Sequence, residues 1–240
     1  MKRTILSLIL VLLTAIAVAI IHKHAIDDDM VSYTVDPAVQ DLRFYWKDEN
    51  GQPLGSIQRL KDLVSKEHRK LVFAMNGGMF KPDQSPVGLF IMQHVMETPL
   101  DTSSGNGNFY LKPNGVLYIT KDGKAGISVT PAFKYSKQIK FATQSGPMLL
   151  IDGDIHPAFK KGSANVNVRN GVGLLPDGKL VFAMSKSGIN FYDFADYFKR
   201  LGCKQALYLD GFVSRTYLPA QHWVQADGNF GVIIGVTESE

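Results

Sequence analysis

The sequence is nearly free of cysteine, and this scarcity limits what can hold the fold together. Its 240 residues contain one cysteine, Cys203, so no disulfide can form within the chain. Cys203 follows an expected helix in the segment RLGCKQ, and we interpret it as a packing residue rather than a nucleophile. The fold must therefore depend on its core, for which 45% hydrophobic residues in a chain of this length suffice.

The common catalytic and cofactor-binding motifs are also missing. The chain has no G-x-S-x-G elbow, no Walker loop and no H-E-x-x-H pair. The glycine-rich segment DTSSGNGNF precedes expected hairpins rather than a helix, which argues against a dinucleotide-binding turn. The six histidines are dispersed, so we predict no metal site and no cofactor, although loops rich in Asp and Asn leave Ca²⁺ binding open.

A concentrated basic patch is lacking as well. The net charge is +4 and the sequence pI is about 9.0, but the basic residues are scattered. The densest run, KEHRK at residues 66–70, falls on an expected helix, and we interpret it as the solvated face of that helix. We therefore expect no nucleic-acid partner.

One long apolar run stands near the start of the chain. It covers residues 5–21 and follows the basic segment MKRT. The run is long for a signal peptide and short for a membrane span, so cleavage and anchoring both stay open. We predict residues 1–30 to be a signal peptide or signal anchor and residues 31–240 to be the exported domain. Export without disulfides indicates the bacterial envelope, with the protein either periplasmic or anchored to the inner membrane facing the periplasm; if uncleaved, the segment is the membrane contact.

Beyond residue 30 the pattern predicts a single α+β domain with a mixed β-sheet, many hairpins and two main helices. Apolar residues at helical spacing predict one helix over residues 57–69, capped by Ser56. The second helix follows Asn190 or Ser187 and ends at Gly202, with an apolar stripe formed by Phe191, Phe194, Phe198 and Leu201. Asn-Gly at residues 114–115 and Asp-Gly at 122–123 and 177–178 predict hairpin turns.

Small and polar residues follow apolar strands at four places. These are Asn76-Gly77-Gly78, Ser145-Gly146-Pro147, Val168-Arg169-Asn170-Gly171 and Asp210-Gly211. Each alone is typical of an ordinary turn, and Asp210 in particular is either a turn former or a site residue. Together they supply backbone N–H groups, an amide, a guanidinium and a carboxylate, a set that can hold a phosphate and act on a neighbouring carbon.

The segments NGGMF, SGPMLLIDG, VRNGVGLLPDGKL and LYLDGFVSRTYLP, in this order, resemble the signature of the phosphodiester glycosidase family. The similarity covers most of the chain from Asn76 onward. It implies a mixed α/β domain with a groove at the strand ends, and cleavage of a sugar from the oxygen of a phosphodiester. The family's Asn-Gly-Gly falls on residues 76–78 of this chain, its arginine on Arg169 and its Leu-Asp-Gly on residues 209–211.

We assign roles to these residues as a hypothesis. Asp210 would be the base or nucleophile at the anomeric carbon, and Arg169 would hold the phosphate, assisted by Asn76 and the amides of Gly77 and Gly78. Further substrate contacts are assigned to Ser145, Gly146, Gly211, Ser214 and Arg215. A phosphate monoester is already a good leaving group, so one carboxylate suffices where ordinary glycosidases need two.

The chain departs from the family directly after Asp210. Where the family usually continues Gly-Gly-Gly-Ser, this chain has Gly211-Phe212-Val213-Ser214, a stiffer and bulkier loop. Two other functions therefore stay open. One is a non-catalytic envelope protein that grips a glycan or a phosphate-bearing polymer, and the other is a phosphodiesterase that attacks phosphorus with the same arginine.

Overall fold

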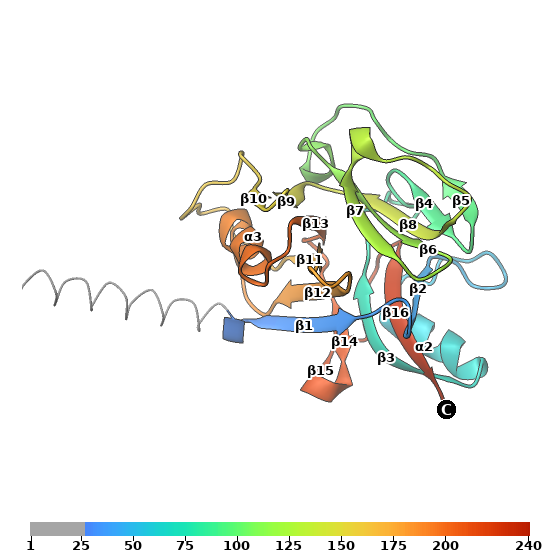
Figure 1. The fold of residues 1–240 in the computed structure, drawn as a ribbon. Helices are drawn as coiled ribbons and strands as arrows, with labels where there is room; N and C mark the ends of the chain where they lie inside the picture. The colour runs from blue at the N-terminus through green and yellow to red at the C-terminus, as the bar shows by residue number, and fades with distance from the viewer. Residues whose placement is uncertain (1–26) are drawn as a thin grey trace, which may run out of the picture. The chain divides into compact units, whose positions relative to one another are not determined.

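A computed structural model describes residues 27–240, of which Val31–Glu240 form one compact unit (Figure 1). The predicted signal or anchor segment at residues 5–21 lies outside the described residues. Within residues 27–240, no helix is both long enough and apolar enough to cross a membrane.

The strands of this unit form three sheets. The first has the order β1 (Met30–Val35), β12 (Leu180–Ser185), β11 (Asn170–Leu174), β13 (Gln205–Asp210), β9 (Met148–Ile151) and β10 (Asp154–Ile155). The second has the order β15 (Trp223–Val224), β14 (Thr216–Leu218), β3 (Arg69–Asn76), β16 (Ile233–Ser239) and β2 (Asp41–Tyr45). The third has the order β5 (Val95–Thr98), β4 (Phe90–Met92), β8 (Ile139–Ser145), β6 (Gly115–Thr120) and β7 (Ala125–Val129).

The prediction of an α+β domain is confirmed, but the prediction of a mixed sheet is wrong. In the second and third sheets, and among β9, β10, β11, β12 and β13 of the first, strands pair antiparallel. Short hairpin connections, such as residues 175–179 between β11 and β12, can join only antiparallel neighbours, because a parallel pair needs a long crossover. The predicted turn at Asn114-Gly115 is also wrong, since Asn114 is buried and Gly115 is the first residue of β6.

Two helices cover the outer faces of two sheets (Figure 1). Helix α2 (Ile57–Lys66) begins after Ser56 as predicted, with the Ser56 hydroxyl accepting from the N–H of Arg59 at 3.3 Å. It ends three residues before the predicted boundary because Arg69 already belongs to β3. Its buried face packs against β3 and β16.

Helix α3 (Phe191–Arg200) packs against the first sheet. Of the two predicted caps, Asn190 is the one used, and its side-chain oxygen accepts from the N–H of Asp193 at 2.9 Å. Phe194 and Phe198 are buried, whereas Leu201 is 40% exposed and does not belong to the apolar stripe. Leu201 lies past the last helical residue, where the chain turns away through Gly202 at φ +85°.

The main core lies where the three sheets face one another. Its buried side chains come from all three sheets and include several phenylalanine rings: Phe44, Phe73, Phe90, Phe141 and Phe182. Three short 3₁₀ segments, Asn108–Tyr110, Thr130–Ala132 and Pro219–Gln221, lie in the connections. This arrangement brings the ends of strands from three sheets toward one place.

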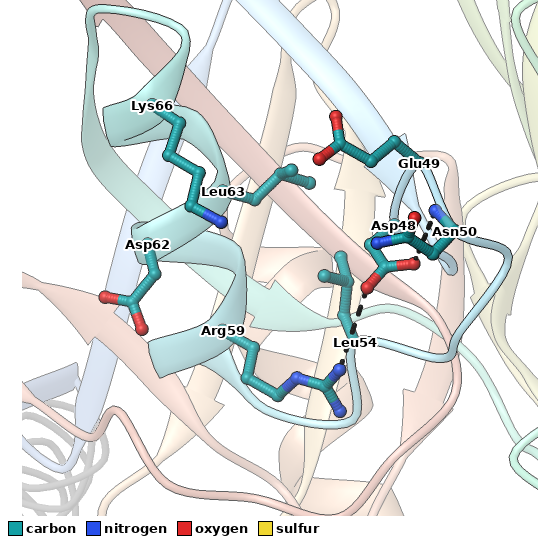
Figure 2. A pocket seen from close by; sticks show the side chains of 8 residues that line it. All are labelled: Asp48, Glu49, Asn50, Leu54, Arg59, Asp62, Leu63 and Lys66. Carbon is teal, nitrogen blue, oxygen red and sulfur yellow. Dashed lines mark hydrogen bonds and ion pairs between the residues drawn. The ribbon is translucent and has the colours of Figure 1, made fainter.

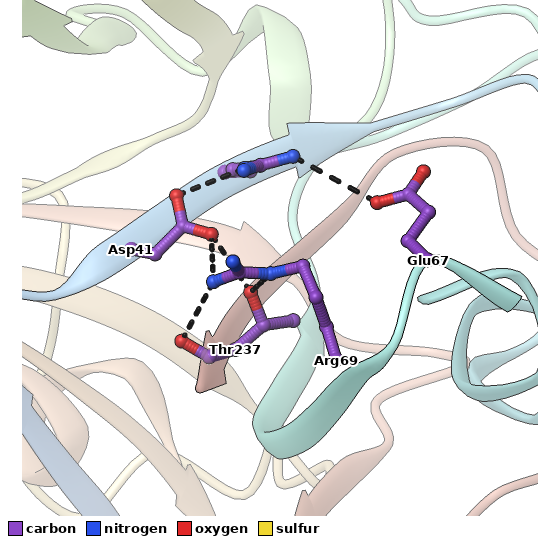
Figure 3. Close-up of polar contacts among 5 residues, drawn as sticks. Asp41, Glu67, Arg69 and Thr237 are labelled. Carbon is purple, nitrogen blue, oxygen red and sulfur yellow. Dashed lines mark hydrogen bonds and ion pairs between the residues drawn. The ribbon is translucent and has the colours of Figure 1, made fainter. Parts of the chain in front are cut away.

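The basic run at residues 66–70 is not a helix face. The helix ends at Lys66, and Arg69 and Lys70 belong to β3. Figure 3 shows the Arg69 guanidinium bound to the carboxylate of Asp41 and to Thr237. Much of the charge of Arg69 is therefore neutralised within the second sheet.

Candidate active site

Strand ends from three sheets meet around one carboxylate. Strand β13 of the first sheet ends at Asp210, β3 of the second ends at Asn76, and β8 of the third ends at Ser145. Strand β11 begins beside β13 with Asn170, which pairs in register with Asp210. These four polar residues are buried, so their hydrogen bonds must be made within the protein.

Asp210 is held as a desolvated carboxylate. Its side chain lies at the end of a buried strand, and the residue is 7% exposed. Burial raises the pKa of Asp210 to about 6, and the N–H of Gly211, the side-chain amide of Asn76 and the N–H of Phe212 partly oppose that rise. Oδ1 accepts the N–H of Gly211 at 2.7 Å, whereas Oδ2 has a longer contact with Asn76 Nδ2 at 3.4 Å. Oδ2 is thus the more weakly bound oxygen.

Asn76 and Asn170 form the support of this carboxylate. Asn170 Nδ2 donates to the backbone oxygen of Asn76 at 2.8 Å and to its Oδ1 at 3.0 Å. Asn170 Oδ1 accepts the backbone N–H of Asp210 at 2.7 Å. Because Asn76 Oδ1 also accepts the N–H of Arg215 at 2.9 Å, its amide is oriented with Nδ2 toward Asp210.

The alternative that Asp210 only forms a turn can be compared with aspartates that do. Asp83, Asp122 and Asp177 lie in exposed turns, and hydrogen bonds to their neighbours lower the pKa of each. Asp210 differs in both respects, because it is buried and its pKa is raised. A turn former has no need of burial, so these properties favour the interpretation of Asp210 as a site residue.

The two predicted serines bind backbone atoms of the Asp210 segment. Ser145 Oγ donates to the oxygen of Leu209 at 2.7 Å, and Ser214 Oγ donates to the oxygen of Asp210 at 3.0 Å. Both serines are buried. Their hydroxyls therefore hold the end of β13 and the loop after it in this structure.

The predicted glycines lie around the site at positions where a larger side chain would collide with neighbouring atoms. A Cβ on Gly77 would lie 2.5 Å from Ile234, one on Gly78 would lie 2.8 Å from Thr143, and one on Gly146 would lie 2.6 Å from Asn114. A Cβ on Gly211 would lie 1.6 Å from the hydroxyl of Tyr208. The N–H of Gly77 is already used, because it donates to the oxygen of Val232 at 2.8 Å.

Arg169 lies beside the site and is 1% exposed. Its Nε and Nη2 groups donate to backbone oxygens of Ile189 and Asn165 at 2.8 and 3.0 Å, and its guanidinium stacks on Phe191 at 3.6 Å from the ring centre. Its Nη1 donates to the Tyr208 hydroxyl at 3.3 Å. Burial lowers the pKa of Arg169, and within residues 27–240 no carboxylate forms an ion pair with it.

Tyr208 connects Arg169 with Asp210. It lies two residues before Asp210 on β13, and its hydroxyl occupies the space that a side chain on Gly211 would fill. Burial raises the pKa of Tyr208 to about 12, while the charge of Arg169 lowers it and that of Asp210 raises it. The Tyr208 hydroxyl therefore lies within the electrostatic range of both charges.

Arg215 contributes its backbone rather than its side chain to this network. Its N–H binds Asn76, while Nε binds the carboxylate of Asp227 at 2.9 Å and Nη1 binds the oxygen of Ser214 at 3.0 Å. The guanidinium is partly exposed but already paired.

Asn170 and Tyr208 were not among the predicted site residues. Asn170 stands next to Arg169 in the segment VRNG, and its side chain turned out to join β3 to β13. Tyr208 lies within the apolar run ALYL, where nothing in the spacing distinguishes it from a core residue. Asn170 could have been found from its place in a polar group at a strand end, but Tyr208 could not.

Other places that could hold a ligand are less suited to catalysis. In residues 27–240 no group of three or more His, Cys, Asp or Glu side chains is placed to hold a metal ion. A hollow of about 210 Å³ lies beside α2. Figure 2 shows the side chains that line it: Asp48, Glu49, Asn50, Leu54, Arg59, Asp62, Leu63 and Lys66. Its acidic and basic side chains largely offset one another, and Asp48 pairs with Arg59 at 3.8 Å.

Comparisons with known proteins agree with the geometry. A profile of the phosphodiester glycosidase family matches residues 69–233. The Escherichia coli K-12 protein YigE, described as uncharacterized, is 39% identical over 222 residues, which cover 91% of this chain and 85% of that protein.

Solved structures share the fold at low sequence identity. The catalytic domain of zebrafish N-acetylglucosamine-1-phosphodiester alpha-N-acetylglucosaminidase, auto-inhibited by its pro-peptide, superposes with a TM-score of 0.58 at 16% identity over 87% of this chain and 82% of that one. A hypothetical protein from Synechocystis gives a TM-score of 0.56 at 14% identity over 87% and 59%. With the family profile covering more than half of the chain, this protein belongs to the phosphodiester glycosidase family.

Proposed function

We propose that this protein is a hydrolase that cleaves a sugar from a sugar-1-phosphodiester, with Asp210 as the reacting carboxylate. The observation that carries the proposal is the raised pKa of Asp210, a buried carboxylate held where strand ends of three sheets meet. Family membership supports the reaction class. The zebrafish relative is named for activity on an N-acetylglucosamine-1-phosphodiester, which makes such compounds the first substrates to test.

The carboxylate would act through its more weakly bound oxygen. With a pKa of about 6, Asp210 is mostly ionised at neutral pH, yet it binds a proton more readily than an exposed aspartate does. Oδ1 is fixed by the N–H of Gly211, so Oδ2 is left to attack the anomeric carbon or to take a proton from an attacking water. The phosphate monoester then leaves without a second carboxylate acting as acid.

The phosphate would be attracted by the charge of Arg169. A buried guanidinium without a carboxylate partner has an uncompensated charge, and an anionic substrate supplies the missing counterion. Its Nη1 reaches the Tyr208 hydroxyl, so we assign Arg169 an action on the site through Tyr208 as well as through its long-range field. Asn76 would help to hold the reacting carboxylate in place.

The second candidate is a non-catalytic protein that binds a glycan or a phosphate-bearing polymer. The loop after Asp210 favours it, since Phe212 and Val213 stand where the family usually has glycines, and Phe212 is 96% exposed there. Either function would be carried out in the bacterial envelope, as the apolar run at residues 5–21 suggests. A structurally similar Burkholderia pseudomallei K96243 protein, whose name includes the words "exported protein", supports that location.

Isotope labelling from water distinguishes the possible reactions. We would incubate the full-length chain with N-acetylglucosamine-1-phosphodiesters and related sugar-1-phosphodiesters in H₂¹⁸O, beside Asp210→Asn and a matched control, Asp177→Asn, which also changes an Asp-Gly pair. Label in the sugar, lost in Asp210→Asn and kept in Asp177→Asn, is the expected result. Label in the phosphate would indicate attack at phosphorus. No turnover of any such substrate by the wild type would contradict an enzymatic function.

A further inference from the structure

One large apolar side chain, that of Phe212, is exposed to solvent two residues after the proposed reacting carboxylate. Phe212 is 96% exposed, the highest value among the large hydrophobic residues that the structure describes as exposed. A phenylalanine in this state gains nothing from the hydrophobic effect until something covers its ring. The position of Phe212 in the chain, close to Asp210, indicates which molecule could cover the ring.

The backbone of Phe212 acts on the carboxylate of Asp210. Its N–H is one of the groups that lower the pKa of Asp210. Phe212 also lies in the loop that directly follows β13, two residues after Asp210. The exposed ring is therefore carried by the loop that begins at the proposed reacting carboxylate.

The loop is fixed on both sides of Phe212. Gly211 lies against the Tyr208 hydroxyl, and Ser214 Oγ binds the oxygens of Asp210 and Gly211 at 3.0 and 3.3 Å. The next residue, Val213, packs its side chain against a buried cluster. The loop thus turns one of its two adjacent apolar side chains inward and presents the other to solvent.

We propose that Phe212 is a specificity-determining residue that stacks on the C–H face of the substrate's sugar. This inference rests on the proposed function, because in that reaction the sugar carries the carbon closest to Asp210. The C–H groups of a pyranose ring form an apolar face, and burying it against an aromatic ring is favourable by the hydrophobic effect and by the negative ring face. The phosphate, which is strongly hydrated, has no comparable gain from contact with the ring.

The test compares binding of a sugar phosphodiester with binding of a phosphodiester that lacks the sugar. We would measure calorimetric binding of N-acetylglucosamine-1-(methyl phosphate) and of dimethyl phosphate to the full-length chain, together with KM and kcat for the former. The variants are Phe212→Ala, Phe212→Trp and the control Tyr135→Ala, which removes a half-exposed aromatic ring elsewhere. A ring half covered by a sugar predicts a loss of about tenfold in affinity and a similar rise in KM for Phe212→Ala.

The expected pattern is specific. Phe212→Ala loses affinity for the sugar compound alone, Phe212→Trp retains it, and Tyr135→Ala leaves both unchanged. Equal binding by Phe212→Ala and wild type overturns the inference, and leaves the proposed function standing if turnover persists. If Phe212→Ala instead weakens only binding to phosphatidylethanolamine–phosphatidylglycerol vesicles, the ring contacts a membrane and the inference is wrong.

The two proposals can fail separately. A wild type that binds the sugar compound in a manner dependent on Phe212 but never cleaves it contradicts the proposed function and supports this inference. A wild type that neither binds nor cleaves the sugar compound contradicts both.

Discussion

Replacing Asp210 with asparagine should remove activity and, at the same time, change how stability depends on pH. The folded protein raises the pKa of Asp210 from 3.8 to about 6 because the carboxylate is buried. Folding therefore favours the protonated form. The resulting contribution to stability is fully present below the unfolded pKa and is lost as the pH rises through the folded pKa.

The size of the effect follows from the shift. Roughly two pKa units at about 1.4 kcal/mol per unit give about 3 kcal/mol, lost between about pH 4 and just above pH 6. The wild type should therefore lose about 3 kcal/mol of unfolding free energy over this range relative to Asp210→Asn, which has no titrating group there. Other groups titrate in both proteins, and their effects cancel in the difference.

The measurement is urea unfolding of both proteins at several values between about pH 3 and pH 8, with Asp177→Asn as the control. Asp177 is exposed and its pKa is lowered, so it does not titrate between pH 5 and pH 7. Asp177→Asn should therefore lose the same unfolding free energy as the wild type between these two pH values. Activity of the wild type should rise through about pH 6, since the base or nucleophile must be ionised. Parallel stability curves for wild type and Asp210→Asn would refute the conclusion that Asp210 is a desolvated carboxylate.

Three further outcomes are expected. Gly211→Ala should lower the free energy of unfolding by about 2 kcal/mol or more, because its Cβ would lie 1.6 Å from the Tyr208 hydroxyl. Adding Tyr208→Phe to that variant should restore part of the lost stability in a double-mutant unfolding cycle. Full additivity of the two effects would contradict this contact. Asn170→Ala should lower the free energy of unfolding by about 3 kcal/mol and remove most of the activity. It leaves the buried backbone oxygen of Asn76 and the N–H of Asp210 without a partner. Asn50→Ala, at an exposed position, should change neither stability nor activity. Cys203 is buried with its pKa raised to about 11, so a thiol reagent should label it only after denaturation, and rapid labelling of the native protein would show the packing to be different.

The parts of the fold that were predictable are those determined by local chemistry. Ser56 and Asn190 begin their helices because a side-chain oxygen at that position binds a free N–H of the first turn. Asp-Gly at residues 122–123 and 177–178 does form hairpin turns, because glycine adopts the positive φ that such turns require. The division into three antiparallel sheets was not predictable, since it depends on pairings such as β16 with both β3 and β2.

For the candidate site, the grouping of the residues was more predictable than their contacts. Polar residues at strand ends identified Asp210, Asn76 and Ser145, and the structure brings them together. Their spacing could not show that the hydroxyl of Ser145 faces the backbone, or that Arg169 is buried beneath an aromatic ring. Such orientations depend on side-chain packing between segments that are distant in the sequence.

The pairing of β16 determines when the site can exist at all. Strand β16 lies between β3 and β2, Ile233 pairs with Asn76, and the oxygen of Val232 holds Gly77. Until residues 232–239 have left the ribosome, β3 lacks its pairing with β16, and the second sheet that carries Asn76 is incomplete. The proposed cleavage of substrate should therefore begin only after nearly the whole domain has been synthesised.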